Sequence, residues 1–153
     1  MMVSMMNKNR KKIVLVVDDE PDIQVILSSY LSRIDGITVV KALSGEEGVE
    51  CYTNLCKENN ASILVVMDLN LSGDNVNSDT IQKQRDGDTS RMDGVRAAEE
   101  ILRIDSQAVI WGYTAWAGTT WSARLTEAGA EKVVDRVVPF KEFAQMVKDF
   151  IKD

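Results

Sequence analysis

The sequence predicts an α/β fold in which one parallel sheet is covered by helices on both faces. Short β-branched runs alternate with amphipathic helical patterns from Ile13 to the carboxyl end. The run Ile63–Met67 carries no charge, as expected of a central parallel strand. Polar residues follow several of these runs, where open parallel sheets bind ligands. Repeated β–α units of this kind predict a doubly wound sheet with right-handed crossovers.

The first half of the chain contains three strand patterns and two helix patterns. Strands are expected over Ile13–Val17, Ile37–Ala42 and Ile63–Met67. Pro21 begins the first helix, since proline is favoured in a first helical turn. The apolar residues at helical spacing in that helix are Ile23, Ile26, Leu27, Tyr30, Leu31 and Ile34. Ser44 and Glu47 predict a capping box at the start of the second helix.

The second half continues the alternation. A helix with one apolar face is expected next, and its apolar residues are Val95, Ala98, Ile101 and Leu102. A strand over Ala108–Tyr113 precedes a helix over Thr120–Ala128, which Gly129 ends. The fifth strand is expected over Val133–Val138. The apolar residues of the last helix are Phe143, Met146, Val147, Phe150 and Ile151.

Length and composition predict one domain over 13–153, preceded by a flexible leader over 1–12. Hydrophobic residues make up 44% of the 153, enough to build a core. A net charge of −6 argues against direct binding of nucleic acid, which needs a basic surface. No export signal or membrane-spanning stretch is evident. Cys51 and Cys56 fall on different faces of one helix, so two free thiols and a cytoplasmic location are expected.

The stretch Asp74–Arg91 interrupts the pattern. It is polar and far longer than the usual β–α connection of about 2–6 residues. It therefore predicts an insertion at about 74–91 on the surface of the domain. A lid, a docking element and a tolerated excursion are the alternatives for its role, and we favour the excursion because long loops cost little stability.

Three aspartates stand at predicted strand ends. Asp18 and Asp19 follow the first strand, Asp68 follows the third, and Thr114 follows the fourth. If the first and third strands are neighbours, the three carboxylates share one pocket and repel each other unless a cation lies between them. Oxygen ligands of this kind suit Mg²⁺, with Mn²⁺ as an alternative ion. The competing interpretation is that these aspartates are unrelated and cap helices or face water.

The local sequences favour the shared pocket. Four motifs stand in order along the chain: Val17-Asp18-Asp19-Glu20-Pro21, Met67-Asp68-Leu69-Asn70, Gly112-Tyr113-Thr114-Ala115 and Gly129-Ala130-Glu131. Together they resemble the receiver domain of two-component response regulators, from about Ile13 to the carboxyl terminus apart from the insertion. The resemblance implies a flavodoxin-like (βα)5 fold with strand order 2-1-3-4-5, here as a stand-alone domain.

The resemblance also implies a role for each matching residue. Asp68 would accept a phosphoryl group from a phosphohistidine, and Thr114 would hydrogen-bond it beside the small Ala115. Asp19 would bind Mg²⁺ directly, Asp18 would hold its water, and the carbonyl of Asn70 would complete the metal shell. A carboxylate is a weak nucleophile, so metal neutralisation must supply most of the catalysis. The chain has no histidine, so the donor would be a histidine kinase or histidine phosphotransfer protein in trans.

The chain departs from the family at two switch positions. The usual lysine after the fifth strand falls on Arg136 by an ungapped count, or on Val138 if Pro139-Phe140 is the anchor; we favour Arg136. The usual switch aromatic is replaced by Val133. Trp116 and Trp121 could serve as an output surface or pack under their helix, and Trp116 could shield the phosphoryl group from water.

The expected function is a signalling phosphoacceptor that switches an unknown downstream protein, rather than a metabolic enzyme. A homodimer through the last two helices and fifth strand is a further expectation. The main rival is a pseudo-receiver that interacts without phosphorylation. A haloacid-dehalogenase-like phosphatase would need an acid where Asn70 stands. A flavodoxin-like cofactor binder is disfavoured because Asp18-Asp19-Glu20 would repel a bound anion.

Overall fold

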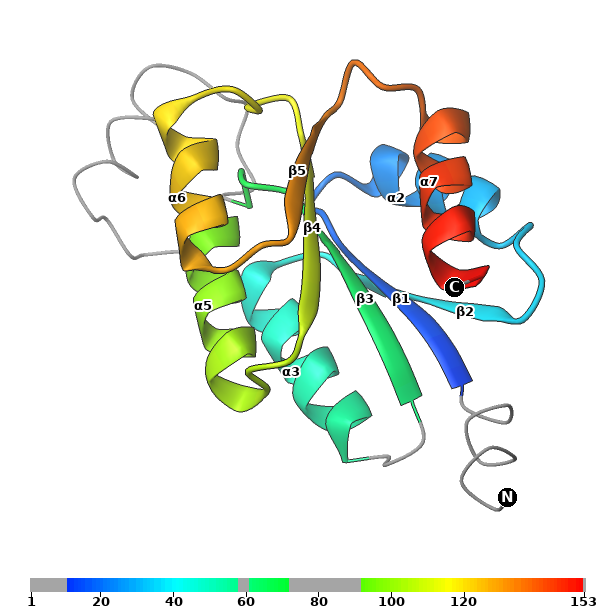
Figure 1. Ribbon diagram of the computed structural model, residues 1–153, viewed down its shortest axis with the longest axis horizontal. Helices are drawn as coiled ribbons and strands as arrows, with labels where there is room; N and C mark the ends of the chain where they lie inside the picture. The colour runs from blue at the N-terminus through cyan, green and yellow to red at the C-terminus, as the bar shows by residue number, and fades with distance from the viewer. Residues whose placement is uncertain (1–10, 58–60, 72–91, 153) are drawn as a thin grey trace.

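The computed structural model describes residues 11–57, 61–71 and 92–152 (Figure 1). The first strand begins at Lys11, so most of the predicted leader lies outside the described residues. The predicted insertion at 74–91 also lies outside them. Within the described part of the chain, no helix combines the length and apolar character needed to cross a membrane.

The strands are β1 (Lys11–Val17), β2 (Ile37–Ala42), β3 (Ala61–Met67), β4 (Val109–Thr114) and β5 (Lys132–Asp135). They form one five-stranded sheet in the order β2-β1-β3-β4-β5, and each neighbouring pair is parallel (Figure 1). This confirms the predicted flavodoxin-like order. The order reverses at β1, between β2 and β3, where open α/β sheets bind ligands. Pairing of Val17 with Met67 places the residues after them, Asp18 and Asp68, side by side.

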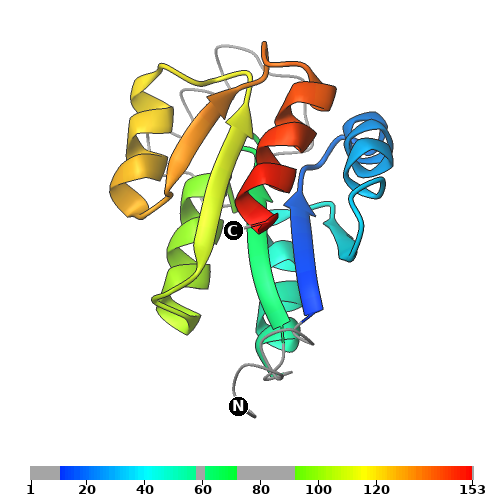
Figure 2. The same cartoon turned by 45° about the vertical axis from the view of Figure 1, so that its right-hand side comes forward.

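The helices are α2 (Pro21–Leu31), α3 (Gly45–Cys56), α5 (Gly94–Ile104), α6 (Thr120–Ala128) and α7 (Phe140–Lys152). Helices α3, α5 and α6 cover one face of the sheet, and α2 and α7 cover the other (Figures 1 and 2). Ser44 caps α3, because its side chain accepts a hydrogen bond from the Glu47 N–H, which is one half of the predicted capping box. Cys51 and Cys56 are free thiols, also as predicted.

Two apolar clusters fill the spaces between the sheet and its helices. On the α3, α5 and α6 side, Tyr52, Ile101 and Leu125 pack against residues of β1, β3 and β4. On the other side, Leu27 and Leu31 of α2 and Phe143 and Val147 of α7 pack against Val14, Val16, Leu64, Val66, Trp111 and Tyr113. Alternate residues of a strand point to opposite faces, so each central strand contributes to both clusters.

The buried face of α2 differs from the predicted one. Ile26 is 41% exposed and Val25 is 63% exposed, whereas the polar side chain of Gln24 is only 2% exposed and Ser28 is buried as well. Positions 24, 27, 28 and 31 form the core-facing stripe. The reason is that the Gln24 amide has hydrogen-bond partners in the sheet, which makes its burial favourable.

Strand β5 ends earlier than predicted, at Asp135 rather than Val138. The Asp135 side chain accepts a hydrogen bond from the Val137 N–H, and the Asp135 main-chain carbonyl accepts one from the Val138 N–H. These bonds close a turn directly after the strand and leave Val137 80% exposed. The β-branched residues past Asp135 therefore form a turn, even though their composition favours a strand.

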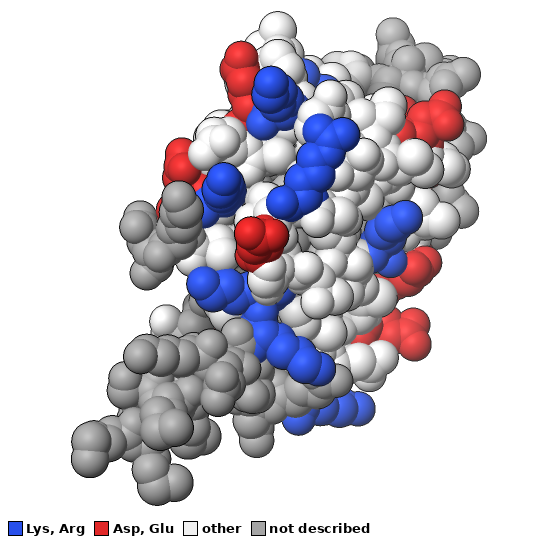
Figure 3. Space-filling view, turned by 90° about the vertical axis from the view of Figure 1, so that its right-hand side faces the viewer, with Lys and Arg blue, Asp and Glu red and all other residues white. Residues whose placement is uncertain are grey.

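The outer face of α2 and α7 is turned toward the viewer in Figure 3. Lysine and arginine side chains are interspersed there with acidic ones on a largely uncharged surface. A uniformly basic face would be the electrostatic sign of nucleic-acid binding. The part of this face that the structure describes has no such uniform charge.

The packing of α7 gives a prediction for stability. Phe143 is fully buried and stacks on Tyr113 with ring centroids 3.9 Å apart, whereas Phe150 is 38% exposed. Phe143→Ala should lower the free energy of unfolding by about 3–5 kcal/mol because it leaves a cavity against the sheet. Phe150→Ala, the control on the same helix, should cost clearly less. Urea denaturation of both variants measures the difference, and equal losses would contradict this account of the core.

Candidate functional site

Asp18, Asp19 and Asp68 meet at the carboxyl edge of the sheet. One carboxylate oxygen from each residue can be chosen so that all of them lie within 4.8 Å of one another. Asp18 is buried, and Asp19 and Asp68 are partly exposed. The structure therefore brings together the three carboxylates that the sequence predicted to share a pocket.

Main-chain hydrogen bonds hold the strand ends that carry these residues. The Asp68 N–H donates to the Val17 carbonyl at 3.0 Å, and the Asp18 N–H donates to the Ala42 carbonyl at 3.1 Å. Gly94 lies against the other side of Asp68, where a Cβ on residue 94 would stand 2.2 Å from the Asp68 carbonyl oxygen. Only glycine allows this close approach of α5 to the loop after β3.

Arg136 supplies a cation to the cluster. It follows β5 directly, and its guanidinium donates to Asp18 Oδ2 at 3.0 Å and to the Tyr113 carbonyl at 2.6 Å. The guanidinium also lies over the Tyr113 ring, 4.6 Å from its centroid. Val138, the alternative from sequence counting, packs instead in the apolar cluster beside α7, and its carbonyl accepts the Tyr113 hydroxyl. Arg136 is thus the residue after β5 that contacts the acidic cluster.

The carboxylates perturb each other's protonation. Burial raises the pKa of Asp68 to about 7, and the charge of Asp18 adds to the rise. The Arg136 charge and hydrogen bonds from Thr114 and the Leu69 N–H act in the opposite direction. Burial also raises the pKa of Asp18 above its ordinary value, although Arg136 and the Glu20 N–H oppose the rise. Near neutral pH, ionising Asp68 in the metal-free site is therefore costly.

Thr114 is fully buried at the end of β4, with its hydroxyl toward Asp68. The same hydroxyl oxygen accepts a hydrogen bond from the Trp116 N–H at 3.2 Å. The Trp116 and Trp121 rings are in contact, with centroids 5.9 Å apart. Trp121 Nε1 in turn donates to Asp93 Oδ2, and Asp93 caps α5. The Thr114 loop is thereby connected to the amino ends of both α5 and α6.

The remaining predicted residues lie near this edge. Asn70 is buried in the loop after β3, and Ala115 is exposed directly after Thr114. Val133, which sequence counting matched to the usual switch aromatic, lies in β5. Its methyl groups pack over Gly112, in the apolar cluster that also contains Leu125 of α6. Val133 has no aromatic ring, so it cannot act as a side-chain ring that rotates between two orientations.

The donor set fits a divalent cation. Three carboxylates within 4.8 Å provide the hard oxygen ligands that Mg²⁺ prefers. The raised pKa values of Asp68 and Asp18 have burial and carboxylate repulsion among their causes, and a bound cation would relieve that repulsion. Asp18, Asp19 and Asp68 are the residues that could hold such an ion.

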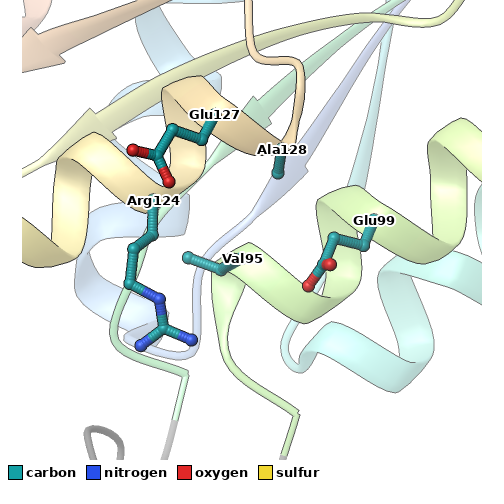
Figure 4. Close-up of a pocket in the computed structure, with 5 residues that line it drawn as sticks. All are labelled: Val95, Glu99, Arg124, Glu127 and Ala128. Atoms are coloured by element: carbon teal, nitrogen blue, oxygen red, sulfur yellow. The ribbon is translucent and has the colours of Figure 1, made fainter.

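A second hollow lies between α5 and α6 and has a volume of about 200 Å³. Val95 and Glu99 of α5 and Arg124, Glu127 and Ala128 of α6 line it (Figure 4). Their charged ends lie on different sides of the hollow and do not converge on one point. The acidic cluster, where polar groups from several strands do converge, is the better candidate for chemistry.

Sequence reasoning missed Gln24. Its buried amide contacts the main chain at the ends of β1 and β2, next to the acidic cluster. The signal was present in the sequence, since Gln24 stands in phase with Leu27 and Leu31, three and seven residues further along α2. A polar residue in the core-facing phase of a helix indicates a specific buried partner.

The sequence matches no protein-family model and no curated protein. Solved structures do match. The response regulator protein TrrA of Thermotoga maritima, in complex with Mg²⁺ and BeF, is 27% identical, with a TM-score of 0.61 over 90% of this chain and 97% of that chain. The response regulator domain of Thermotoga maritima CheB is 18% identical, with a TM-score of 0.67 over 94% and 95%.

A third match is the CheX–CheY–BeF3–Mg²⁺ complex of Borrelia burgdorferi, at 20% identity and a TM-score of 0.65 over 91% of this chain and 88% of that chain. These structures cover the domain nearly end to end. The chain therefore has the receiver-domain fold of response regulators, which confirms the resemblance drawn from the four motifs.

The pKa of Asp68 predicts how stability depends on pH without metal. Its folded pKa of about 7 exceeds the ordinary 3.8, so the unfolded chain releases the proton first as pH rises. The metal-free protein should lose stability between about pH 4 and about pH 7, and Mg²⁺ should restore it. Asp68→Asn, which removes the charge, should flatten the profile.

Thermal melts in EDTA and in Mg²⁺ measure this dependence. The exposed Asp22 of α2 offers a matched control, because Asp22→Asn should leave the profile as in the wild type. A wild-type melting temperature that rises through this pH range in EDTA would contradict the assignment.

Proposed function

We propose that this chain is a phosphoacceptor module of a two-component phosphorelay, in which Asp68 receives a phosphoryl group from a phosphohistidine of a partner. The observation that carries the proposal is the convergence of Asp18, Asp19 and Asp68 within 4.8 Å at the switch point of the sheet. The chain contains no histidine, so the donor is a histidine kinase or a histidine phosphotransfer protein in trans.

In the proposed step, an oxygen of the Asp68 carboxylate attacks phosphorus and forms a new P–O bond. The P–N bond to the partner's imidazole breaks, and the imidazole nitrogen that is released takes up a proton from water. When bound, Mg²⁺ (or Mn²⁺) neutralises the transferring oxygens and so lowers the cost of bringing two anions together. Asp19 and Asp68 are proposed as direct ligands, Asp18 as the holder of a metal-bound water, and the Asn70 carbonyl as a further ligand.

Two groups are proposed to contact the phosphoryl group, which carries a charge of about −2. The Thr114 hydroxyl can turn from its present contacts to donate to a phosphoryl oxygen. Arg136 already reaches the cluster through its bond to Asp18 Oδ2, and its planar guanidinium can offer two parallel donors to an oxyanion. Ala115, exposed directly after Thr114, is proposed to allow phosphoryl access because its side chain is small.

The contact between Arg136 and Asp18 also favours a second candidate, a pseudo-receiver that signals without phosphate. A guanidinium bound to Asp18 partly neutralises the cluster and could stand in for a metal ion. The replacement of the switch aromatic by Val133 agrees with such a role. Binding of Mg²⁺ separates the two functions, since a pseudo-receiver of this kind needs none.

In either case the chain acts by changing its affinity for a downstream protein, and not by turning over a metabolite. A cytoplasmic location and a homodimer through α6, β5 and α7 remain predictions from the sequence. The receiver-like neighbours agree with a signalling role, and one of them, from Borrelia burgdorferi, is a complex of CheY with CheX.

Phosphorylation gives the direct test. Incubation with Mg²⁺ and a small phosphodonor should add one phosphoryl group, detected by intact mass. Asp68→Asn should abolish the adduct, and EDTA should prevent it. Asp22→Asn, an exposed carboxylate on α2, should still be modified. An unmodified wild-type protein that also binds no Mg²⁺ would favour the pseudo-receiver.

The bond between the Trp116 N–H and Thr114 gives a prediction about the switch. If Thr114 turns toward the phosphoryl group, this bond weakens and the contact between the Trp116 and Trp121 rings changes. Tryptophan fluorescence should therefore change on adding Mg²⁺ with beryllium fluoride, a phosphoryl mimic. Thr114→Val removes the hydroxyl and should remove most of that change.

Trp111→Phe is the matched control for this experiment. Trp111 lies on the α7 side of the sheet, and its ring N–H donates a hydrogen bond to Glu131. Replacing it should therefore leave the fluorescence change intact. A full fluorescence response in Thr114→Val would show that the Thr114 hydroxyl does not move the tryptophan pair.

A further inference from the structure

The Gln24 side chain is a buried polar group that contacts main-chain carbonyls next to the acidic cluster. Its Nε2 lies 3.0 Å from the Val16 carbonyl, 3.0 Å from the Asp18 carbonyl and 2.8 Å from the Ala42 carbonyl. An amide nitrogen has two hydrogens, so these three carbonyls share them. The Gln24 Oε1 atom is buried and has no hydrogen-bond partner among the described residues. The amide is therefore held by its donor end alone.

These carbonyls mark the point where the β1–β2 ladder stops. The last paired residues are Val17 and Ala42, and the Asp18 N–H still reaches the Ala42 carbonyl at 3.1 Å. Strand β2 ends there, and the chain turns toward α3. The Asp18 carbonyl lies past the last strand pair, and Gln24 supplies the donor that a longer β2 would have provided. One side chain from α2 thus completes the ladder.

The hydrogen bond from Gln24 to the Asp18 carbonyl bears on the directions in which the Asp18 and Asp19 side chains point. In a continuing strand, Asp18 and Asp19 would point to opposite faces of the sheet. Both carboxylates nevertheless reach one cluster with Asp68, so the backbone must turn at Asp18. The chain does leave β1 after Val17. The Gln24 amide donates a hydrogen bond to the Asp18 carbonyl, the first of that turn. The same amide nitrogen also contacts the Ala42 carbonyl at the end of β2.

We propose that Gln24 is a positioning residue for the metal site: through the Asp18 carbonyl it fixes the turn that directs the Asp18 and Asp19 carboxylates toward Asp68. The inference rests on the proposed function, because it concerns how the same carboxylates receive Mg²⁺. Gln24 itself offers no ligand atom, since its amide nitrogen faces main-chain carbonyls. It acts only through the geometry of Asp18 and Asp19.

Gln24→Met tests the role. Methionine fills nearly the same volume but has no donor, so the Asp18 carbonyl loses its side-chain partner and the turn is freed. Residues that orient metal ligands typically change metal affinity by about 10–100-fold when replaced. Gln24→Met should weaken Mg²⁺ binding by about 10-fold, measured by isothermal titration calorimetry.

Ser28→Ala is the matched control. Ser28 is buried one turn further along the same face of α2, and its hydroxyl has no partner among the described residues. Among the described residues its hydroxyl makes no hydrogen bond to the Asp18 turn, so Ser28→Ala should leave Mg²⁺ affinity unchanged. A purely structural role for Gln24 would lower the melting temperature in EDTA without changing the Mg²⁺ dissociation constant. That result would overturn the inference.

The outcomes also separate this inference from the proposed function. Absence of Mg²⁺ binding by the wild-type protein would overturn both. Equal Mg²⁺ affinities in the wild type and Gln24→Met would overturn only the positioning role. If Gln24→Met fails to fold, NMR of the wild type decides. The Gln24 side-chain amide signals should shift on addition of Mg²⁺ as the turn settles around the ion, and signals that do not move would overturn the inference.

Discussion

The carboxylates of Asp18, Asp19 and Asp68 lie within 4.8 Å of one another, and their mutual repulsion is the constraint on which the rest of the site depends. Burial strengthens that repulsion, because it removes the water that would screen the charges. Burial is the main cause of the raised pKa of Asp68, and the charge of Asp18 raises that pKa further. A bound cation would relieve this repulsion, so in the proposed function metal binding and the readiness of Asp68 for phosphoryl transfer are coupled.

The fold resists this repulsion with bonds from four neighbouring segments. The Val17 carbonyl of β1 holds the Asp68 N–H, the Ala42 carbonyl of β2 holds the Asp18 N–H, and Gln24 of α2 holds the Asp18 carbonyl. Arg136, after β5, brings the opposing charge. Each bond comes from a different part of the chain, so the geometry of the cluster depends on the assembled sheet and not on any one loop.

The same edge of the sheet connects the site to two helices. Thr114 accepts the Trp116 N–H, the rings of Trp116 and Trp121 touch, and Trp121 donates to the cap of α5 at Asp93. Val133 has no ring to turn, so we propose that a movement of Thr114 would reach α5 and α6 through this tryptophan contact. In the proposed switch, Trp116 on the loop after β4 and Trp121 of α6 would take the place of the aromatic expected on β5.

The sequence by itself determined the parallel sheet, and the resemblance of its four motifs to receiver domains implied the strand order that makes the acidic residues converge. Uncharged β-branched runs end at fixed positions, and a parallel sheet places those ends at one edge. Counting along the chain also favoured Arg136 over Val138. Only the tertiary structure decided that Gln24 is buried, that Ile26 is exposed and that β5 stops at Asp135. Periodicity detects apolar faces, but a buried polar atom is stabilised by partners on other strands, which a pattern along one segment does not contain.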